Sequence, residues 1–290
     1  MHFKKVKGIL SPQNGMNLSR GCVHGCIYCD SRSRCYKIEH DFEDVEIKIN
    51  APELLEKKLK GKRRRCMIGT GAMSDPYIPI DESLSNTRAC FELIEKYGFG
   101  LSVITKSDLI LRDLDLLTSI NRKAKCVVQM TLTTFDEELC KIIEPNVCTS
   151  LRRFEVLKIL RDKGIKTVVW LCPLLPFIND TAENLRGILG YCIEAEVYGI
   201  LCFGMGMTLR DGNREYFYEK LDKHFPGLRA RYEKKYGYSY SISCGNSREL
   251  MALLHKACAE NNIICDTNKL FEFASTLDEK AEEKQPELFF

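Results

Sequence analysis

Short apolar runs alternate with longer segments of helical periodicity from about residue 50 onward. The short runs have the length and the β-branched residues of buried strands, whereas apolar residues recur every three or four positions in the longer segments, as in amphipathic helices. The pattern predicts five strands, at Cys66–Thr70, Leu101–Thr105, Cys126–Thr131, Thr167–Leu171 and Ile200–Phe203. The helices predicted between them span Leu84–Tyr97, Leu109–Asn121, Ser150–Lys163 and Thr181–Glu194.

A further strand at Met16–Leu18, followed by a helix at Ala51–Lys60, brings the pattern to six βα units. Strands that alternate with helices form parallel sheets. The expected fold class is therefore α/β, a partial (β/α)6 barrel of the TIM type with parallel strands. Functional side chains of such barrels lie at the carboxyl ends of the strands, so chemistry is expected in the loops that follow the strands.

The alternation stops after Phe203, and the segment Arg210–Tyr240 interleaves aromatic residues with Arg and Lys. Aromatic rings stack on bases and cations bind phosphates, so this composition is compatible with nucleic acid, although a helical layer that closes one end of the barrel has the same composition. We expect a barrel domain at 1–205, a mostly helical, aromatic and basic extension packed on the barrel at 206–276, and a flexible tail at 277–290.

The composition is that of a globular protein, with 44% hydrophobic and 29% charged residues among 290. No run approaches the roughly 20 apolar residues that span a bilayer, and the first ten residues lack the apolar run of a signal peptide. We therefore expect a cytoplasmic protein without membrane contact. The odd number of 15 cysteines, many of them in apolar segments, favours reduced thiols over disulfides.

Charge gives a weaker indication of partners. The net charge of +3 does not by itself indicate a nucleic-acid-binding protein. Seven Lys and Arg residues cluster between Lys57 and Arg65, at the end of a predicted helix, and could contact phosphates. A solvated helix end, where cations are favourable, is the simpler interpretation of the same run.

Three cysteines, Cys22, Cys26 and Cys29, lie in the single short stretch RGCVHGCIYCD after the first predicted strand. Soft thiolates bind both iron–sulfur clusters and zinc, so the spacing alone does not choose the metal. A structural zinc ion would need a fourth ligand, which His24 or Cys35 could offer.

The C-x3-C-x2-C motif, with the aromatic Tyr28 just before its last cysteine and six βα units in the chain, resembles the radical S-adenosylmethionine (SAM) superfamily, and in its details the spore photoproduct lyase-like branch. The resemblance covers roughly residues 8–205. It implies that Cys22, Cys26 and Cys29 hold three irons of one [4Fe–4S] cluster and that the open iron chelates SAM. Reduced by an electron donor, such a cluster cleaves SAM to a 5′-deoxyadenosyl radical, which abstracts a substrate hydrogen.

The resemblance also implies which residues bind SAM, and Tyr28 is counted among them. The stretch GTGAMSDPY contributes Gly71 and Ser74. Ser74 stands where the family has the serine that meets the SAM amino group. Lys106 matches the lysine that pairs with the SAM carboxylate, and Thr133 matches a hydroxyl position after the fourth strand. Structural interpretations stay open, since Ser74 could form a turn before Pro76 and Lys106 could be a surface charge.

Two departures argue against a true spore photoproduct lyase. The family's hydrogen-donating cysteine, two residues before the serine, is Ala72 here, and the tyrosine after the last cluster cysteine is Asp30. Cys35 is closer to the cluster loop and is interpreted as an ordinary loop thiol, so no catalytic side chain is assigned. We expect a nucleic-acid substrate, with two alternatives: a small metabolite or peptide as substrate, or a non-catalytic metal-binding protein that binds nucleic acid.

Two further patterns concern partners and cofactors. Gln285–Phe289 resembles the Q-x-x-L-F peptide that docks on the replication sliding clamp, and its charged tether suits a peptide of this kind. Cys244, Cys258 and Cys265 could bind a second cluster, but their wide spacing is more typical of buried thiols. We therefore expect one cluster.

Overall fold

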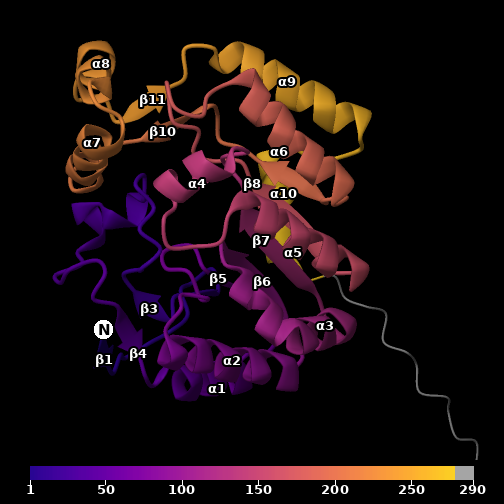
Figure 1. Ribbon diagram of the computed structural model, residues 1–290. Helices are drawn as coiled ribbons and strands as arrows, with labels where there is room; N and C mark the ends of the chain where they lie inside the picture. Colours follow the sequence, from indigo (N-terminus) through magenta and orange to yellow (C-terminus); the bar gives the residue numbers. More distant parts are fainter. Residues whose placement is uncertain (278–290) are drawn as a thin grey trace, which may run out of the picture.

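The computed structural model describes residues 1–277. Its centre is a sheet of six parallel strands in the order β2-β5-β6-β7-β8-β9 (Figure 1). The strands span Gly15–Met16 (β2), Met67–Thr70 (β5), Gly100–Thr105 (β6), Cys126–Thr131 (β7), Lys166–Trp170 (β8) and Gly199–Leu201 (β9). The strand order follows the chain, so the predicted partial barrel of parallel strands is confirmed.

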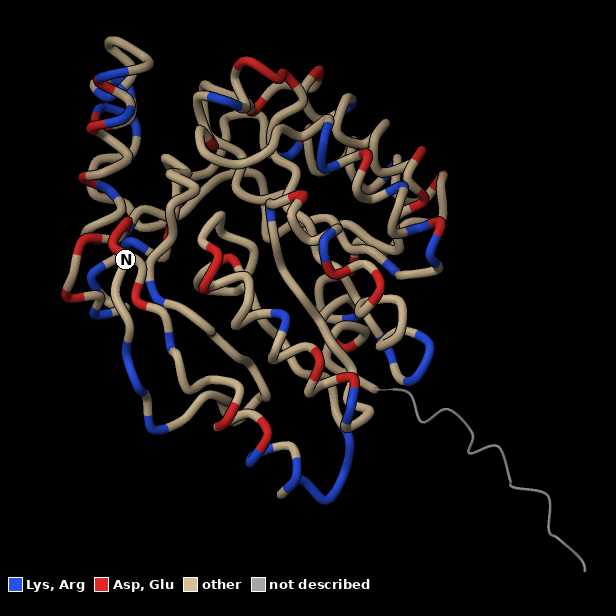
Figure 2. Tube along the Cα trace, turned by 60° about the horizontal axis from the view of Figure 1, so that its bottom comes forward, with Lys and Arg blue, Asp and Glu red and all other residues tan. Residues whose placement is uncertain are grey.

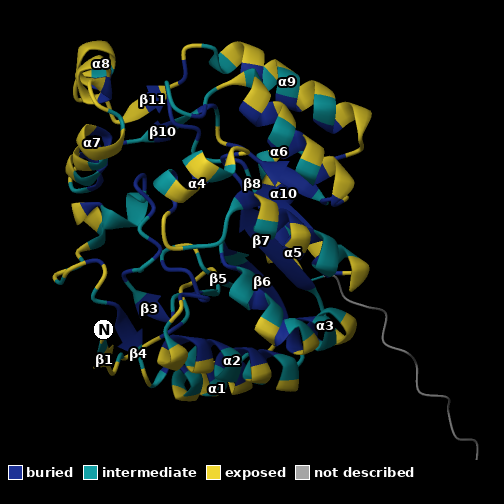
Figure 3. Cartoon of the chain, in the orientation of Figure 1, coloured by how far each residue is buried: buried dark blue, intermediate teal, exposed yellow. Residues whose placement is uncertain are grey.

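Helices cover the outer face of this sheet, and their apolar faces pack on strand residues such as Val103 and Val128 in one core. All six residues of β7 are buried, as expected of a strand covered on both faces. Figure 3 shows the contrast between the buried strands and the exposed outer faces of the helices. The covering helices are α1 (Ala51–Lys60), α2 (Asp81–Lys96), α3 (Leu114–Lys123), α5 (Ser150–Asp162) and α6 (Ala182–Glu194).

The inner face is partly filled by α10 (Thr267–Ser275), a helix that the sequence pattern does not predict. Its Leu270 is buried in a separate cluster with Met67, Val127 and other inward residues of the strands. Gly199 on β9 makes room for this helix, because a Cβ there would lie 2.3 Å from a methyl group of Leu270. The space left on the inner side therefore lies toward the carboxyl ends of the strands.

A small second sheet lies beside the first, in the order β1-β4-β3. Its strands are His2–Lys4 (β1), Ser19–Arg20 (β3) and Glu46–Lys48 (β4), with β1 parallel and β3 antiparallel to β4. Short 3-10 helices at Asp30–Arg32 (η1) and Arg34–Tyr36 (η2) follow the cysteines, and a third precedes α3 at Asp108–Asp113 (η3). The chain between β3 and β4 thus holds the whole cysteine motif.

Most of the remaining elements lie around the carboxyl ends of the strands, whereas the last of them packs on the outside of α6 (Figure 1). They are α4 (Glu137–Ile143), β10 (Gly206–Thr208), α7 (Asn213–His224), α8 (Leu228–Tyr236), β11 (Ser241–Ser243) and α9 (Ser247–Glu260). β10 and β11 form an antiparallel pair, and α9 packs on α6. The extension is mostly helical, as expected, and the division at residue 205 stays a prediction. No helix within residues 1–277 is long and apolar enough to cross a membrane.

Candidate active site

The loop with the three cysteines is held by backbone hydrogen bonds on both sides. The N–H of Cys22 donates to the carbonyl of Phe42 at 3.0 Å, and the N–H of Ile27 donates to the carbonyl of Ile143 at 3.0 Å. Gly21 has a φ of 87°, and a Cβ there would lie 2.4 Å from the Phe42 oxygen. The loop therefore needs glycine at this position to lie so close to the segment before β4.

The three thiols belong to one short loop and differ in burial. Cys26 is buried, whereas Cys22 and Cys29 are half-buried. Burial raises the pKa of Cys22 to about 12, so this thiol stays protonated until a metal displaces the proton.

Asp75 joins the ends of two strands, a role that the sequence analysis missed. Its carboxylate accepts hydrogen bonds from the N–H of Tyr77 at 2.9 Å, the hydroxyl of Thr105 at 2.8 Å and the N–H of Lys106 at 2.8 Å. The imidazole of His24 lies 3.6 Å from the same carboxylate. The loops after β5 and β6 are thereby fixed to each other and face the cysteine loop.

Gly71 and Ser74 were both predicted to bind SAM, but they differ in their position relative to the cavity. Gly71 lines the cavity described below, and a Cβ there would lie 1.9 Å from the carbonyl oxygen of Ile104. Ser74 is buried and does not line the cavity: its hydroxyl donates to the carbonyl of Gly21 at 2.6 Å and hydrogen-bonds the Ser19 hydroxyl at 2.8 Å. Ser74 therefore fastens the start of the cysteine loop to the end of β5.

Lys106 and Thr133 were also both predicted to bind SAM, and the structure places them in different surroundings. Lys106 lines the cavity and forms no ion pair within residues 1–277. Burial alone lowers the pKa of Lys106, but the neighbouring Cys26 and Glu144 outweigh it, so the pKa is raised and the side chain is a cation. Thr133 is fully buried beyond the end of β7 and lies outside the cavity lining.

Tyr28 lines the cavity with a buried ion pair behind it. Its hydroxyl donates to Glu144, which pairs with Arg153 at 2.5 Å, and both charged side chains are buried. Burial, and then the Glu144 charge, raises the pKa of Tyr28 well above its usual range. Arg153 also donates to the carbonyls of Lys106 at 2.9 Å and Thr131 at 3.1 Å, so one guanidinium ties together two strand ends.

These residues meet in a cavity of about 510 Å³ at the carboxyl ends of the strands, between the cysteine loop and the β10–β11 pair. Five of the predicted site residues line it: Cys26, Cys29, Tyr28, Gly71 and Lys106, whereas Cys22 lies just outside the lining. Ala72 and Asp30, the two departures from the lyase pattern, line it as well. Other lining residues, which were not predicted, include Trp170, Cys172 and Met205. Trp170 lies in the predicted strand Thr167–Leu171, and Cys172 and Met205 lie in the loops after the last two predicted strands.

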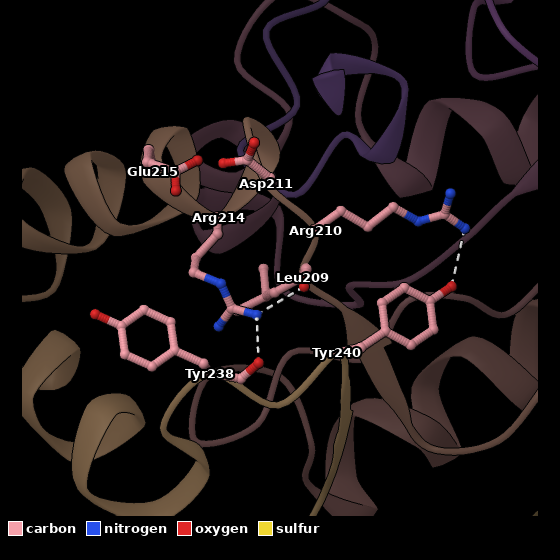
Figure 4. Close-up of a pocket in the computed structure, with 7 residues that line it drawn as sticks. All are labelled: Leu209, Arg210, Asp211, Arg214, Glu215, Tyr238 and Tyr240. Carbon is pink, nitrogen blue, oxygen red and sulfur yellow. Dashed lines mark hydrogen bonds between the residues drawn. The ribbon is translucent and has the colours of Figure 1, made fainter. Parts of the chain in front are cut away.

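An open groove of about 640 Å³ adjoins the cavity along the β10–β11 pair. Thr208 and Ser241, which pair with each other, line the cavity, and the next residues outward, Leu209 and Tyr240, line the groove. Figure 4 shows Arg210 and Arg214 opposite Tyr238 and Tyr240. The Arg210 guanidinium lies 5.2 Å from the Tyr240 ring centroid and donates to its hydroxyl at 2.9 Å, and Tyr238 is 95% exposed.

The basic run Lys57–Arg65 lies elsewhere. It joins the end of α1 to the start of β5, at the amino edge of the sheet and away from the cavity. In Figure 2 cations and anions alternate over most of the tube, and one longer stretch of cations stands at the lower edge. Two of its lysines have partners, since Lys60 pairs with Glu56 at 3.2 Å and Lys62 donates to Asn14 at 2.7 Å.

Comparison with known proteins shows the family to which the chain belongs. Residues 16–188 match the model of the radical SAM superfamily. An uncharacterized protein of Mycobacterium tuberculosis is 29% identical over 227 residues, which are 76% of this chain and 66% of the relative. An uncharacterized protein of Methanocaldococcus jannaschii is 35% identical over 163 residues, 55% of this chain and 60% of the relative. The chain thus spans less than two thirds of the length of these relatives.

Among solved structures, a spore photoproduct lyase mutant with bound SAM and a dinucleoside spore photoproduct has a similar fold. Its TM-score is 0.61 at 14% identity, and the match covers 90% of this chain and 76% of the lyase. Another mutant of the lyase gives a TM-score of 0.63, also at 14% identity, over 89% and 77% of the two chains. At this identity the likeness concerns the fold.

Proposed function

The chain belongs to the radical SAM superfamily and is a radical SAM enzyme, and from this premise we propose that Cys22, Cys26 and Cys29 hold its [4Fe–4S] cluster and that the reaction takes place in the cavity at the strand ends. When bound, the cluster and SAM supply the 5′-deoxyadenosyl radical that abstracts a substrate hydrogen. The observation that carries the proposal is the cavity that Cys26 and Cys29 share with the cation Lys106, which has no ion-pair partner within residues 1–277.

We assign two kinds of role to the residues that were predicted to bind SAM: contact with SAM in the cavity, and support of the cavity from outside its lining. Lys106 pairs with the SAM carboxylate, because an unpaired ammonium on a cavity wall is the natural partner of that anion. Tyr28 and Gly71 form the adjoining walls. Ser74 acts through the cysteine loop that it fastens, and Thr133 acts through the packing beyond β7.

The substrate that we propose is a nucleic acid. The groove offers the exposed rings of Tyr238 and Tyr240 beside the half-buried guanidinium of Arg210, and aromatic rings with a cation suit the bases and phosphates of single strands. Trp170 and the 60% exposed Phe203, which line the cavity itself, meet edge to face at 5.7 Å between ring centroids. A base entering the cavity would therefore find aromatic rings in the cavity lining as well as in the groove. The clamp-like peptide Gln285–Phe289 lies outside the described residues and stays a prediction.

Anaerobic turnover with SAM and deuterated single-stranded oligonucleotides tests the proposal. We expect deuterium to enter 5′-deoxyadenosine, because the radical takes its hydrogen from the substrate. Transfer from deuterated metabolites or peptides, but not from oligonucleotides, would show that the substrate class is wrong. If the iron-loaded, reduced protein forms no 5′-deoxyadenosine under any condition, the assignment of the cavity fails as well.

A further inference from the structure

A group of potential metal ligands lies on the small sheet, outside the cavity. His2 begins β1, and His40 and Asp44 lie in the segment that leads into β4. One ligand atom from each lies within 4.8 Å of the other two. The imidazole rings meet edge to face at 4.8 Å between centroids, and His2 Nδ1 lies 2.9 Å from Asp44 Oδ2. The other oxygen of Asp44 pairs with the amino group of Met1 at 2.9 Å.

The hydrogen bonds of His40 leave one ring nitrogen free to bind a metal. Its Nδ1 lies 2.9 Å from the carbonyl oxygen of Asp41. Since a carbonyl only accepts, Nδ1 carries the proton in the neutral ring, and Nε2 keeps its lone pair. That Nε2 is buried and has no hydrogen-bond partner among residues 1–277. Metal-binding histidines show this arrangement, with one nitrogen on the metal and the other donating to a backbone carbonyl or carboxylate.

A second orphaned polar atom belongs to Glu46, which pairs with His2 across β1 and β4. The side chain of Glu46 is 3% exposed, and its Oε1 has no hydrogen-bond partner in the part of the chain that the structure describes. The other oxygen lies 2.7 Å from Lys4 Nζ and 3.9 Å from His2 Nε2. Leaving a buried carboxylate oxygen unpaired is unfavourable, so this second observation also indicates a missing positive partner.

We propose that His2, His40 and Asp44 bind one divalent cation of the zinc class, with Glu46 as the neighbouring negative charge. Two imidazoles and a carboxylate suit zinc and its neighbours, whereas magnesium and calcium prefer oxygen ligands alone. Zinc holds such ligand atoms about 3.4 Å apart, which the present spacing reaches by small side-chain movements. His2 and Asp44 are 39% and 43% exposed, so an ion enters from solvent. The site is independent of the proposed reaction.

The site lies next to the support of the cysteine loop. Phe42, between His40 and Asp44, accepts the hydrogen bond from Cys22 N–H and packs against Gly21. A cation that joins β1 to this segment restrains the backbone under the first cysteine. Its role is therefore to stiffen the frame of the loop, away from the substrate.

Titration of the tag-free, cluster-loaded full chain with Co²⁺ tests the site. We expect one equivalent to give weak visible bands without the near-ultraviolet thiolate-to-cobalt band, because the ligands are nitrogen and oxygen. His40→Gln and Asp44→Asn should each weaken this binding at least tenfold, whereas His255→Gln, on the exposed face of α9, should leave it unchanged.

Two results would overturn the proposal. One is Co²⁺ binding that is equal in His40→Gln, Asp44→Asn and the parent protein, and the other is a spectrum dominated by thiolate ligation. Far-ultraviolet circular dichroism and iron content identify a variant that fails to fold, and His2→Gln, at the edge of the sheet, then replaces it. Slower amide exchange around Cys22 in the presence of Zn²⁺ is the expected sign of the stiffened loop.

Discussion

The six parallel strands of the sheet end at a carboxyl edge and begin at an amino edge, and the cations at these two edges differ in their contacts. At the carboxyl edge, Lys106 and Arg153 are fixed among strand ends, and Arg153 is fully buried with its hydrogen bonds made by carbonyls and Glu144. At the amino edge, the run Lys57–Arg65 joins α1 to β5, and its Lys60 and Lys62 contact Glu56 and Asn14. The sequence shows more charge at the amino edge, yet the cavity lies at the other. Position relative to the strand ends, and not the number of charges, therefore marks the site.

The largest difference between the edges is expected for their thiols. Cys26→Ala removes a proposed cluster ligand, so we expect loss of the brown chromophore and of all 5′-deoxyadenosine formation. Cys66→Ala, just before β5 at the amino edge, should keep both. Iron content and anaerobic turnover provide the measurement, and equal iron loading of the two variants would break the comparison.

The next largest difference is expected in the free energy of unfolding when glycines are replaced by alanine. Gly71→Ala forces a side chain onto a φ of 94° and against the Ile104 carbonyl, so we expect unfolding to become easier by about 3 kcal/mol. Gly190→Ala is the matched control, because this position lies in α6 with open space around it, and it should stabilise by up to about 1 kcal/mol. Urea denaturation measures both. A Gly71→Ala change within about 0.5 kcal/mol of the parent protein would show that the backbone yields there.

Substitutions of lysines at the two edges should differ in their effect on the KM for SAM, by a smaller factor than the changes above. Lys106→Met removes the proposed partner of the SAM carboxylate, so we expect the KM for SAM to rise about tenfold, equivalent to about 1.4 kcal/mol. Lys166→Met, at the amino end of β8, should leave it unchanged. A parallel rise in both variants, measured by 5′-deoxyadenosine formation at varied SAM, would contradict a specific role of Lys106.

The smallest effect concerns oligonucleotide binding. Arg210→Ala removes a cation from the groove, so binding of single-stranded DNA should weaken severalfold and its dependence on salt should become shallower. Lys57→Ala and Lys58→Ala at the amino edge should have little effect. Fluorescence anisotropy at several salt concentrations separates the two. The groove is not the nucleic-acid surface if the amino-edge variants weaken binding more.

Repeated features of the fold could be predicted from the sequence. Each βα unit carries its own periodicity, so the six parallel strands and the covering helices were predicted correctly to within a few residues. The strands of the small sheet have two or three residues, too few for any pattern, and α10 finds its place only through long-range packing of Leu270. These elements could not be predicted from local sequence.

The same distinction holds for the site. The cysteines and Lys106 were predicted from their positions after strands together with the family resemblance, and the structure places Cys26, Cys29 and Lys106 around one cavity. The roles of Asp75 and Glu144 were missed because Asp75 binds Lys106, 31 residues away, and Glu144 binds Tyr28, 116 residues away. Ser74 was predicted to meet SAM, and in the structure its hydroxyl bonds to Gly21. Remote partners of this kind carry no signal in a single sequence.

Electron paramagnetic resonance of the anaerobically reconstituted and reduced protein, with and without SAM, tests the central claim most directly. The account predicts a brown protein with one [4Fe–4S] cluster whose spectrum changes when SAM is added, because SAM binds to the iron that no cysteine holds. A colourless protein with one zinc ion, or a cluster spectrum that SAM leaves unchanged, would contradict it.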